Sequence, residues 1–228
     1  MNDPAESSAT ICGLEIRRAD LAEPASGRVL VDCTLDDGDF HDLDLSEVVF
    51  KRCSLRRARF DGARLGGAQF LQCRGGEGSF VGADLDEAVV TGGDFNNASF
   101  RRAKLTSARL QRCKLTGADF TDAGMLGVVL EEVLLAYARL PGMAFRKSTF
   151  RQVDFSEADL RKCDFRLAVF EDSSLRNASL DGCRFEQADL RGADLGGVEL
   201  MDARLFRGAV ISRVQAAELL SQLGLRVL

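Results

Sequence analysis

The stretch FEQADLRGADLGGVEL, from Phe185 to Leu200, carries a large apolar residue at every fifth position. A small residue precedes three of these four positions by two places, at Ala188, Ala193 and Val198. A period of five matches neither the 3.6-residue period of an α-helix nor the two-residue period of a β-strand. The stretch therefore predicts a repeating unit made of a short extended segment followed by a turn.

The same period runs through most of the chain. From Leu30 to Val210, 37 positions fall on the five-residue beat, and all but Gly75, Val90, Met125 and Val210 hold Leu or Phe. The position two residues before each of these centres is nearly always Ala, Gly, Ser, Cys or Val, and the remaining positions are mostly polar or Gly. One large and one small inward residue per unit predict a narrow solenoid whose units must stack to bury their apolar side chains.

This five-residue pattern resembles that of the pentapeptide-repeat proteins over about residues 28–210. The resemblance implies an all-β fold, a right-handed quadrilateral β-helix in which four pentapeptides complete one coil. With 37 units we expect about nine coils, and hence a rod about 45 Å long at roughly 4.8 Å per coil. We expect a disordered tail at residues 1–10, the β-helix at 11–210, and a C-terminal capping and dimerisation segment at 211–228.

Both ends of the repeat depart from the regular phase. Ile16 and Leu21, with Leu14 and Ala19 two places before them, are one residue out of phase and predict a first coil fragment over 11–21. Pro24 and Gly27 mark a short insertion over 22–28. At the other end, the tail ISRVQAAELLSQLGLRVL predicts a short helix that begins after Ser212 and ends near Gly224, followed by a short strand at 225–228.

Gly75 stands where the pattern requires a large residue. With four units per coil, Leu55 and Phe95 are its stacking neighbours, and the missing side chain leaves a void unless Phe95 leans into the space. Two interpretations remain open, a compensated change in the core and a local bulge or recognition loop.

The polar and sulfur-containing residues give no signal for catalysis or for a cofactor. Six of the seven Cys occupy the small inward position and substitute for Ala as buried hydrophobes, at Cys33, Cys53, Cys73, Cys113, Cys163 and Cys183. No CxxC pair indicates zinc, and the single His41 lies at an outward position. No nucleotide-binding glycine motif is present. We therefore expect a non-enzyme without cofactor or metal.

Charge and hydropathy limit the partners. The net charge of −5 argues against direct binding to nucleic acid through a broad basic surface, and permits binding to a basic protein surface. The first twenty residues lack a secretion signal pattern, and no run of 18 apolar residues predicts a membrane span, so we expect a cytoplasmic protein. The acidic cluster Asp84, Asp86 and Glu87 is the candidate for contact with a basic partner.

Four outward positions near the middle of the chain break the polar pattern. They are Leu126, Val129, Leu134 and Tyr137, and they fall within about one coil. An exposed apolar patch is typical of an interface, so we add these four residues to the candidate partner-binding residues.

One subset of the family, the quinolone-resistance proteins of the Qnr and mycobacterial type, resembles this chain in its length, its almost pure repeat and its tail from Gln215 to Val227. That resemblance implies a DNA-mimicking homodimer that binds DNA gyrase and topoisomerase IV and counters a topoisomerase poison, a quinolone or a natural product whose producer needs self-resistance. It also implies dimerisation through the tail, for which the candidates are Val214, Ala217, Leu220, Leu223, Leu225 and Val227. The unbroken phase leaves no room for the long loops that some members need, so protection and plain inhibition of gyrase both remain open. The alternative is a non-enzymatic scaffold that binds another protein through the apolar positions.

Overall fold

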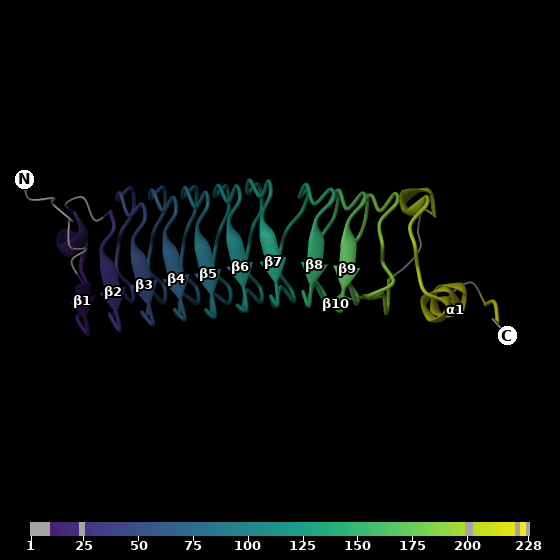
Figure 1. Cartoon of the computed structure of the whole chain (residues 1–228), viewed down its shortest axis with the longest axis horizontal. Helices are drawn as coiled ribbons and strands as arrows, with labels where there is room; N and C mark the ends of the chain where they lie inside the picture. The colour runs from purple at the N-terminus through teal and green to yellow at the C-terminus, as the bar shows by residue number, and fades with distance from the viewer. Residues whose placement is uncertain (1–9, 23–25, 199–202, 222–223, 227–228) are drawn as a thin grey trace, which may run out of the picture.

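The computed structural model describes residues 10–22, 26–198, 203–221 and 224–226. The chain forms a rod of stacked coils with its two ends at opposite ends of the rod (Figure 1). This is a parallel β-solenoid of about nine coils, so the predicted β-helix is confirmed. The predicted tail at 1–10 lies outside the described residues except for Thr10, and part of the predicted insertion, residues 23–25, lies outside them too.

One side of the rod, the sheet face, is a parallel sheet of nine three-residue strands. They run in chain order as β1 (Thr10–Cys12), β2 (Val29–Val31), β3 (Val49–Lys51), β4 (Gln69–Leu71), β5 (Val89–Thr91), β6 (Arg109–Gln111), β7 (Val129–Glu131), β8 (Thr149–Arg151) and β9 (Val169–Glu171). From β2 onward the register is constant, as in the pairs Leu30 with Phe50 and Phe150 with Phe170, and it is the spacing that four units per coil require. Two further short strands, β10 (Ser173–Ser174) and β11 (Ala193–Asp194), pair with each other.

The other three sides follow the sheet face in chain order and are held by isolated bridges with the same spacing. The second face contains the bridge Thr34–Ser54, the third face Asp39–Arg59 and the fourth face Asp44–Arg64. The backbone N–H and C=O groups thus find partners in the neighbouring coils, which allows the chain to stack without longer strands.

The interior is filled by the residues that the five-residue beat predicts. The rings of Phe40, Phe60, Phe80, Phe100 and Phe120 stack in one column with centroids 4.9–5.2 Å apart. The small residues two places before the centres are as inaccessible as the rings, and Ala58, Ala63 and Ala68 expose none of their surface. Close packing explains why this position tolerates little beyond Ala, Ser, Cys and Val.

The corners of the coils adopt a left-handed backbone conformation. The second residue after the centre has a positive φ at almost every corner, between 48° and 64° for the non-glycine residues. β-Branched side chains are strongly disfavoured there, and no Val, Ile or Thr is found among those residues. Gly, Asn and Asp at this position are therefore explained by backbone conformation as much as by exposure.

The described part of the first coil is poorly covered. Ile11 pairs with Leu30, one residue short of the regular spacing, and Ile16 and Leu21 are buried, as the shifted phase predicts. A 3-10 helix, η1 (Arg18–Leu21), ends this coil. Leu14, which was expected at an inward position, is 57% exposed, so that expectation is wrong. Ala19 is exposed as well, and both residues belong to the terminal coil, which no further coil covers within the described residues.

Gly75 is a compensated change in the core and no bulge. The ladder of backbone hydrogen bonds continues through this unit. The Gly75 N–H donates to the Asp94 carbonyl oxygen at 2.7 Å, and the Glu77 N–H donates to the Asn96 carbonyl oxygen at 2.9 Å. The ring of Phe95 occupies the space that a side chain at position 75 would need. Phe95 packs edge-on against Phe70 with centroids 5.9 Å apart, and is 1% exposed.

The regular phase ends earlier than the sequence predicts, because neither Leu205 nor Val210 lies at a centre. Asp189 bridges to Val210, one residue beyond the regular spacing, and Val210 is 46% exposed although it was expected at a centre. Phe206 takes the inward place expected for Leu205, and its ring stacks on Phe185 with centroids 4.9 Å apart. The extra residue falls near the 3-10 helix η2 (Ala203–Phe206), just after residues 199–202, which lie outside the described residues.

Candidate interaction surface

Most carboxylates on the rod are engaged by the rod itself. Arginines one coil away pair with Asp32, Asp37 and Asp44, at 2.6–2.9 Å. Other pairs form within a single unit, such as Arg166 with Asp164. Hydrogen bonds from these guanidinium groups lower the pKa of the aspartates, to about 2 for Asp44. Local cations therefore compensate part of the acidic surface.

The predicted acidic cluster lies on the fourth face and is only partly free. Asp84 is 3.7 Å from the Lys104 ammonium and accepts the Asp86 N–H at 3.2 Å. Asp86 accepts the Thr106 N–H at 2.7 Å. Glu87 alone of the three makes no side-chain hydrogen bond or ion pair with any residue that the structure describes. The structure brings the three residues together, but it already uses two of them to join neighbouring coils.

The four predicted apolar residues are all exposed, but they do not form one flat patch. Leu126 is 71% exposed, at the corner before the sheet face, and Val129 is 39% exposed, on β7. Leu134 is 42% exposed on the second face, and Tyr137 is 64% exposed at the following corner. They form a band around part of one coil, so a single flat partner surface cannot contact all four.

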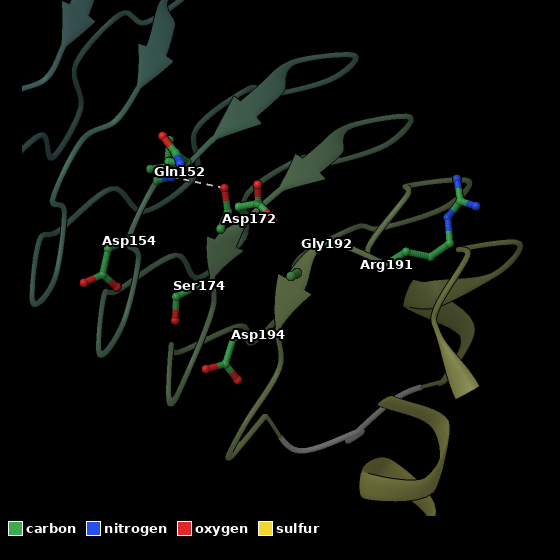
Figure 2. Close-up of a pocket in the computed structure, with 10 residues that line it drawn as sticks. Gln152, Asp154, Asp172, Ser174, Arg191, Gly192 and Asp194 are labelled. Carbon is green, nitrogen blue, oxygen red and sulfur yellow. Dashed lines mark hydrogen bonds between the residues drawn. The ribbon is translucent and has the colours of Figure 1, made fainter. Parts of the chain in front are cut away.

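A shallow depression of about 640 Å³ lies where the sheet face meets the second face, near β10 and β11 (Figure 2). Asp154, Ser174 and Asp194 occupy successive coils along it. Asp194 is ion-paired with Arg176 at 2.9 Å, and Asp154 accepts the Ser156 N–H at 2.9 Å. Both carboxylates are thus already bonded to groups of the rod.

The cysteines behave as the sequence predicts. The six in-phase thiols are free, at most 2% exposed, and lie within the core. The Cys163 and Cys183 thiols donate to the carbonyl oxygens of Leu140 and Leu160, at 3.0 and 2.9 Å. Burial raises the pKa of Cys113 to about 12, which keeps it a thiol. Among the described residues, no group of His, Cys, Asp and Glu is arranged to hold a metal ion.

The C-terminal helix α1 (Arg213–Ser221) closes the rod, with the caps that the sequence predicts. The Ser212 hydroxyl accepts the Gln215 N–H at 3.2 Å, and Gly224, with φ +75°, lies just after the helix. The Leu225 N–H donates to the Leu220 carbonyl, as in a Schellman motif. The short strand predicted at 225–228 is wrong for Leu225 and Arg226, while residues 227 and 228 lie outside the described residues.

Three of the candidate dimerisation residues lie on the side of the capped end that faces away from the rod. Gln215 and Leu219 are buried against the last coil, with 6% exposure each. Val214, Leu220 and Leu225 remain exposed, at 69%, 36% and 54%. Ala217 is half-buried, and Leu223 and Val227 lie outside the described residues. Gln215 was missed as a capping residue because its polar side chain gives no hydrophobic signal.

No helix in the described ranges has both the length and the apolar character needed to cross a bilayer. His41 lies on the surface, half-exposed, with Nδ1 2.8 Å from the Asp39 carboxylate.

Comparison with known proteins identifies the repeat. The family model described as pentapeptide repeats matches in eight copies, at residues 39–74, 53–92, 83–122, 129–166 and 168–205. A trypsin-treated variant of QnrB1, a plasmid-mediated fluoroquinolone resistance protein, superposes with a TM-score of 0.67 at 20% identity, over 97% of this chain and 98% of that chain. Full-length QnrB1 gives a TM-score of 0.64 at 19% identity, over 96% and 98%. A comparison with curated protein sequences gives no significant match.

Proposed function

The chain belongs to the pentapeptide-repeat family, and we propose that it binds a type II topoisomerase, DNA gyrase or topoisomerase IV, and confers resistance to a topoisomerase poison. The observation that carries the proposal is the match to the QnrB1 solenoid over 97% of this chain, together with the Qnr-like tail from Gln215 to Val227. The poison is a quinolone or a natural product, and the protein acts without catalysis.

The proposed assembly is a homodimer joined through the C-terminal ends. Val214, Leu220 and Leu225 are exposed at the capped end of the rod, where a second copy would cover them. Two rods end to end would span about 90 Å at roughly 4.8 Å per coil, on the scale of a bound DNA segment. Because many carboxylates are already bonded within the rod, any mimicry of DNA would rest on the shape and length of the rod more than on continuous negative charge.

Dimerisation is tested by light scattering. Deletion of residues 213–228 should give a monomer, and an unchanged mass would contradict the role of the tail. Because the deletion also removes Gln215, the substitution Val214→Asp provides a second variant that leaves the buried side of the helix intact. We expect Val214→Asp to weaken the dimer while the unfolding temperature changes little.

The function is tested in a supercoiling assay with purified gyrase, with and without a fluoroquinolone. The expected result is either restored supercoiling in the presence of the poison or inhibition in its absence, and these outcomes separate protection from inhibition. No effect on either reaction at micromolar protein would contradict the proposal. The buried free thiols suit the reducing cytoplasm, where this activity would take place.

The exposed band formed by Leu126, Val129, Leu134 and Tyr137 supports a second candidate, a scaffold that binds another protein. A pull-down with Leu134→Asp and Tyr137→Asp separates the two functions. The scaffold would be favoured if the wild type captures no topoisomerase and if the variant loses every partner that the wild type captures.

A further inference from the structure

Charge is distributed unevenly along the rod axis. Residues 81–100 carry four carboxylates and no Lys or Arg, whereas residues 101–120, the next coil, carry six Lys and Arg and one carboxylate. In the following coil, residues 121–140 hold three carboxylates and one Arg, together with the exposed apolar band. The rod therefore presents one basic coil between two acidic ones.

Several cations of the basic coil are free. Arg109 on β6, Arg112 at the next corner and Lys114 on the second face are all exposed. None of the three side chains makes a hydrogen bond or ion pair with any residue that the structure describes, in contrast with Lys104, which pairs with Asp84. Three cations without an ion pair among the described residues, on adjoining faces, form a site of positive charge.

The same two faces carry apolar side chains one coil further along. Val129 is the register partner of Arg109 in the sheet, and Leu134 bridges to Lys114. The basic–apolar patch consists of Arg109, Arg112, Lys114, Val129, Leu134 and Tyr137, all of them exposed. Arg and Tyr are among the residue types that most often dominate binding energy at protein interfaces.

We infer that the basic–apolar patch binds an acidic segment of the topoisomerase that also carries apolar side chains, and that this patch, and not the acidic cluster on the fourth face, provides the main recognition surface. The inference rests on the proposed function for the identity of the partner.

Charge complementarity favours a polypeptide over nucleic acid. A phosphate backbone following the rod would leave the basic coil within roughly 5 Å, one coil spacing, and would then meet Asp94 on one side or Glu132 on the other. An extended polypeptide advances by about 3.3 Å per residue, and can set carboxylates against Lys114 and Arg112 while apolar groups cover Leu134 and Tyr137. It therefore satisfies both halves of the patch, which a polyanion cannot do.

The test measures binding of the intact gyrase and topoisomerase IV complexes to the immobilised full-length protein. The patch variant is Arg112→Glu with Lys114→Glu, and the matched control is Arg146→Glu with Lys147→Glu, which makes the same charge change at the corner between the fourth face and the sheet face. Both control side chains are exposed, and neither forms a hydrogen bond or ion pair with the described part of the chain. Glutamate already occupies the left-handed corners at Glu77, Glu87 and Glu132, so Arg112→Glu is compatible with the backbone.

We expect the patch variant to bind at least about tenfold more weakly than the wild type, as is typical when charges at an interface centre are reversed, and the control to bind within about twofold. A third variant, Asp84→Asn with Glu87→Gln, should bind as tightly as the wild type. If this acidic variant weakens binding and the patch variant does not, the inference is wrong while the proposed function stands. Equal losses in patch variant and control would also overturn it, and failure of the wild type to bind would overturn both.

Discussion

The side-chain amide of Gln215 donates two hydrogen bonds, to the carbonyl oxygens of Leu190 and Ala193, each at 2.6 Å. These carbonyls belong to the last regular coil, where the chain leaves the five-residue phase. A buried carbonyl without a partner is costly, and a solenoid end presents several of them. The helix thus closes the rod with a polar side chain as well as with the apolar side chain of Leu219.

Replacing Gln215 should destabilise the capped end. Gln215→Ala leaves both carbonyls without their donor, and we expect a loss of about 1–3 kcal/mol in the free energy of unfolding. Gln215→Glu keeps the size but removes the donors, so at pH 7 it should be at least as damaging. Urea unfolding measures both effects, and Glu218→Ala, on an exposed part of the same helix, is the control. A Gln215→Ala protein as stable as the control would show that water replaces the amide.

The sequence predicts the helix and its caps but not which side of the helix packs against the rod. Ser212 and Gly224 give local signals that survive in the structure. Gln215 gives no such local signal. Its role depends on the direction of the carbonyl groups of Leu190 and Ala193, which only the folded coil determines. Val214 and Leu220, which the sequence gives as candidates for dimerisation, remain exposed on the capped end of the rod.

Adding even a methyl group at Gly75 should destabilise the protein. A Cβ at this position would overlap the ring of Phe95, so Gly75→Ala should cost about 1–3 kcal/mol through overpacking. Gly76→Ala is the matched control, because its Cβ would meet only the Asn96 carbonyl oxygen, at 3.5 Å. The measurement is the midpoint of urea unfolding, compared between variants whose m-values are equal.

A double-mutant cycle tests the cause. Phe95→Leu alone leaves part of the space empty, and combined with Gly75→Ala it should recover much of the loss, since the two residues share one volume. Simple additivity of the two substitutions would contradict the direct exchange of volume between them.

Two registers are distinguishable at the end of the regular phase, one with Phe206 inward and one with Leu205 inward. Phe206 stacks on Phe185, with an angle of 6° between the ring planes. Phe206→Ala should therefore cost about 2–3 kcal/mol, somewhat below the range for a fully buried Phe because the side chain is only partly buried. Leu205→Ala should cost clearly less. The reverse order in thermal or urea unfolding would mean that the predicted phase, with Leu205 inward, is the correct one.

The repeat makes the core predictable but leaves the surface open. The five-residue period identifies the inward residues, and the resemblance to the pentapeptide-repeat family adds the four units per coil and hence the four faces. The extra residue near η2 cannot be predicted in this way, because Leu200 and Leu205 still lie at the expected five-residue positions. Only the stacking of Phe206 on Phe185 shows the shift. The free cations Arg112 and Lys114 escape prediction for another reason: no local motif marks them, and the charge imbalance lies between successive coils.

Stability should fall in acid because the aspartates lose their arginine partners. The pKa of Asp44 is lowered to about 2, first by the hydrogen bond from Arg64, whereas an unfolded Asp titrates near 3.9. The folded state therefore binds fewer protons in this range, so the stabilisation is complete above about pH 4 and is lost as the pH falls toward 2.

Asp164, whose pKa is lowered by Arg166, acts in the same direction, and its side chain is 24% exposed. We expect the urea midpoint to decrease between pH 4 and pH 2. The decrease should be smaller in the Asp44→Asn and Asp164→Asn double variant, which is less stable at pH 7 but has less to lose. A decrease of the same size in the variant would assign the acid sensitivity to other carboxylates.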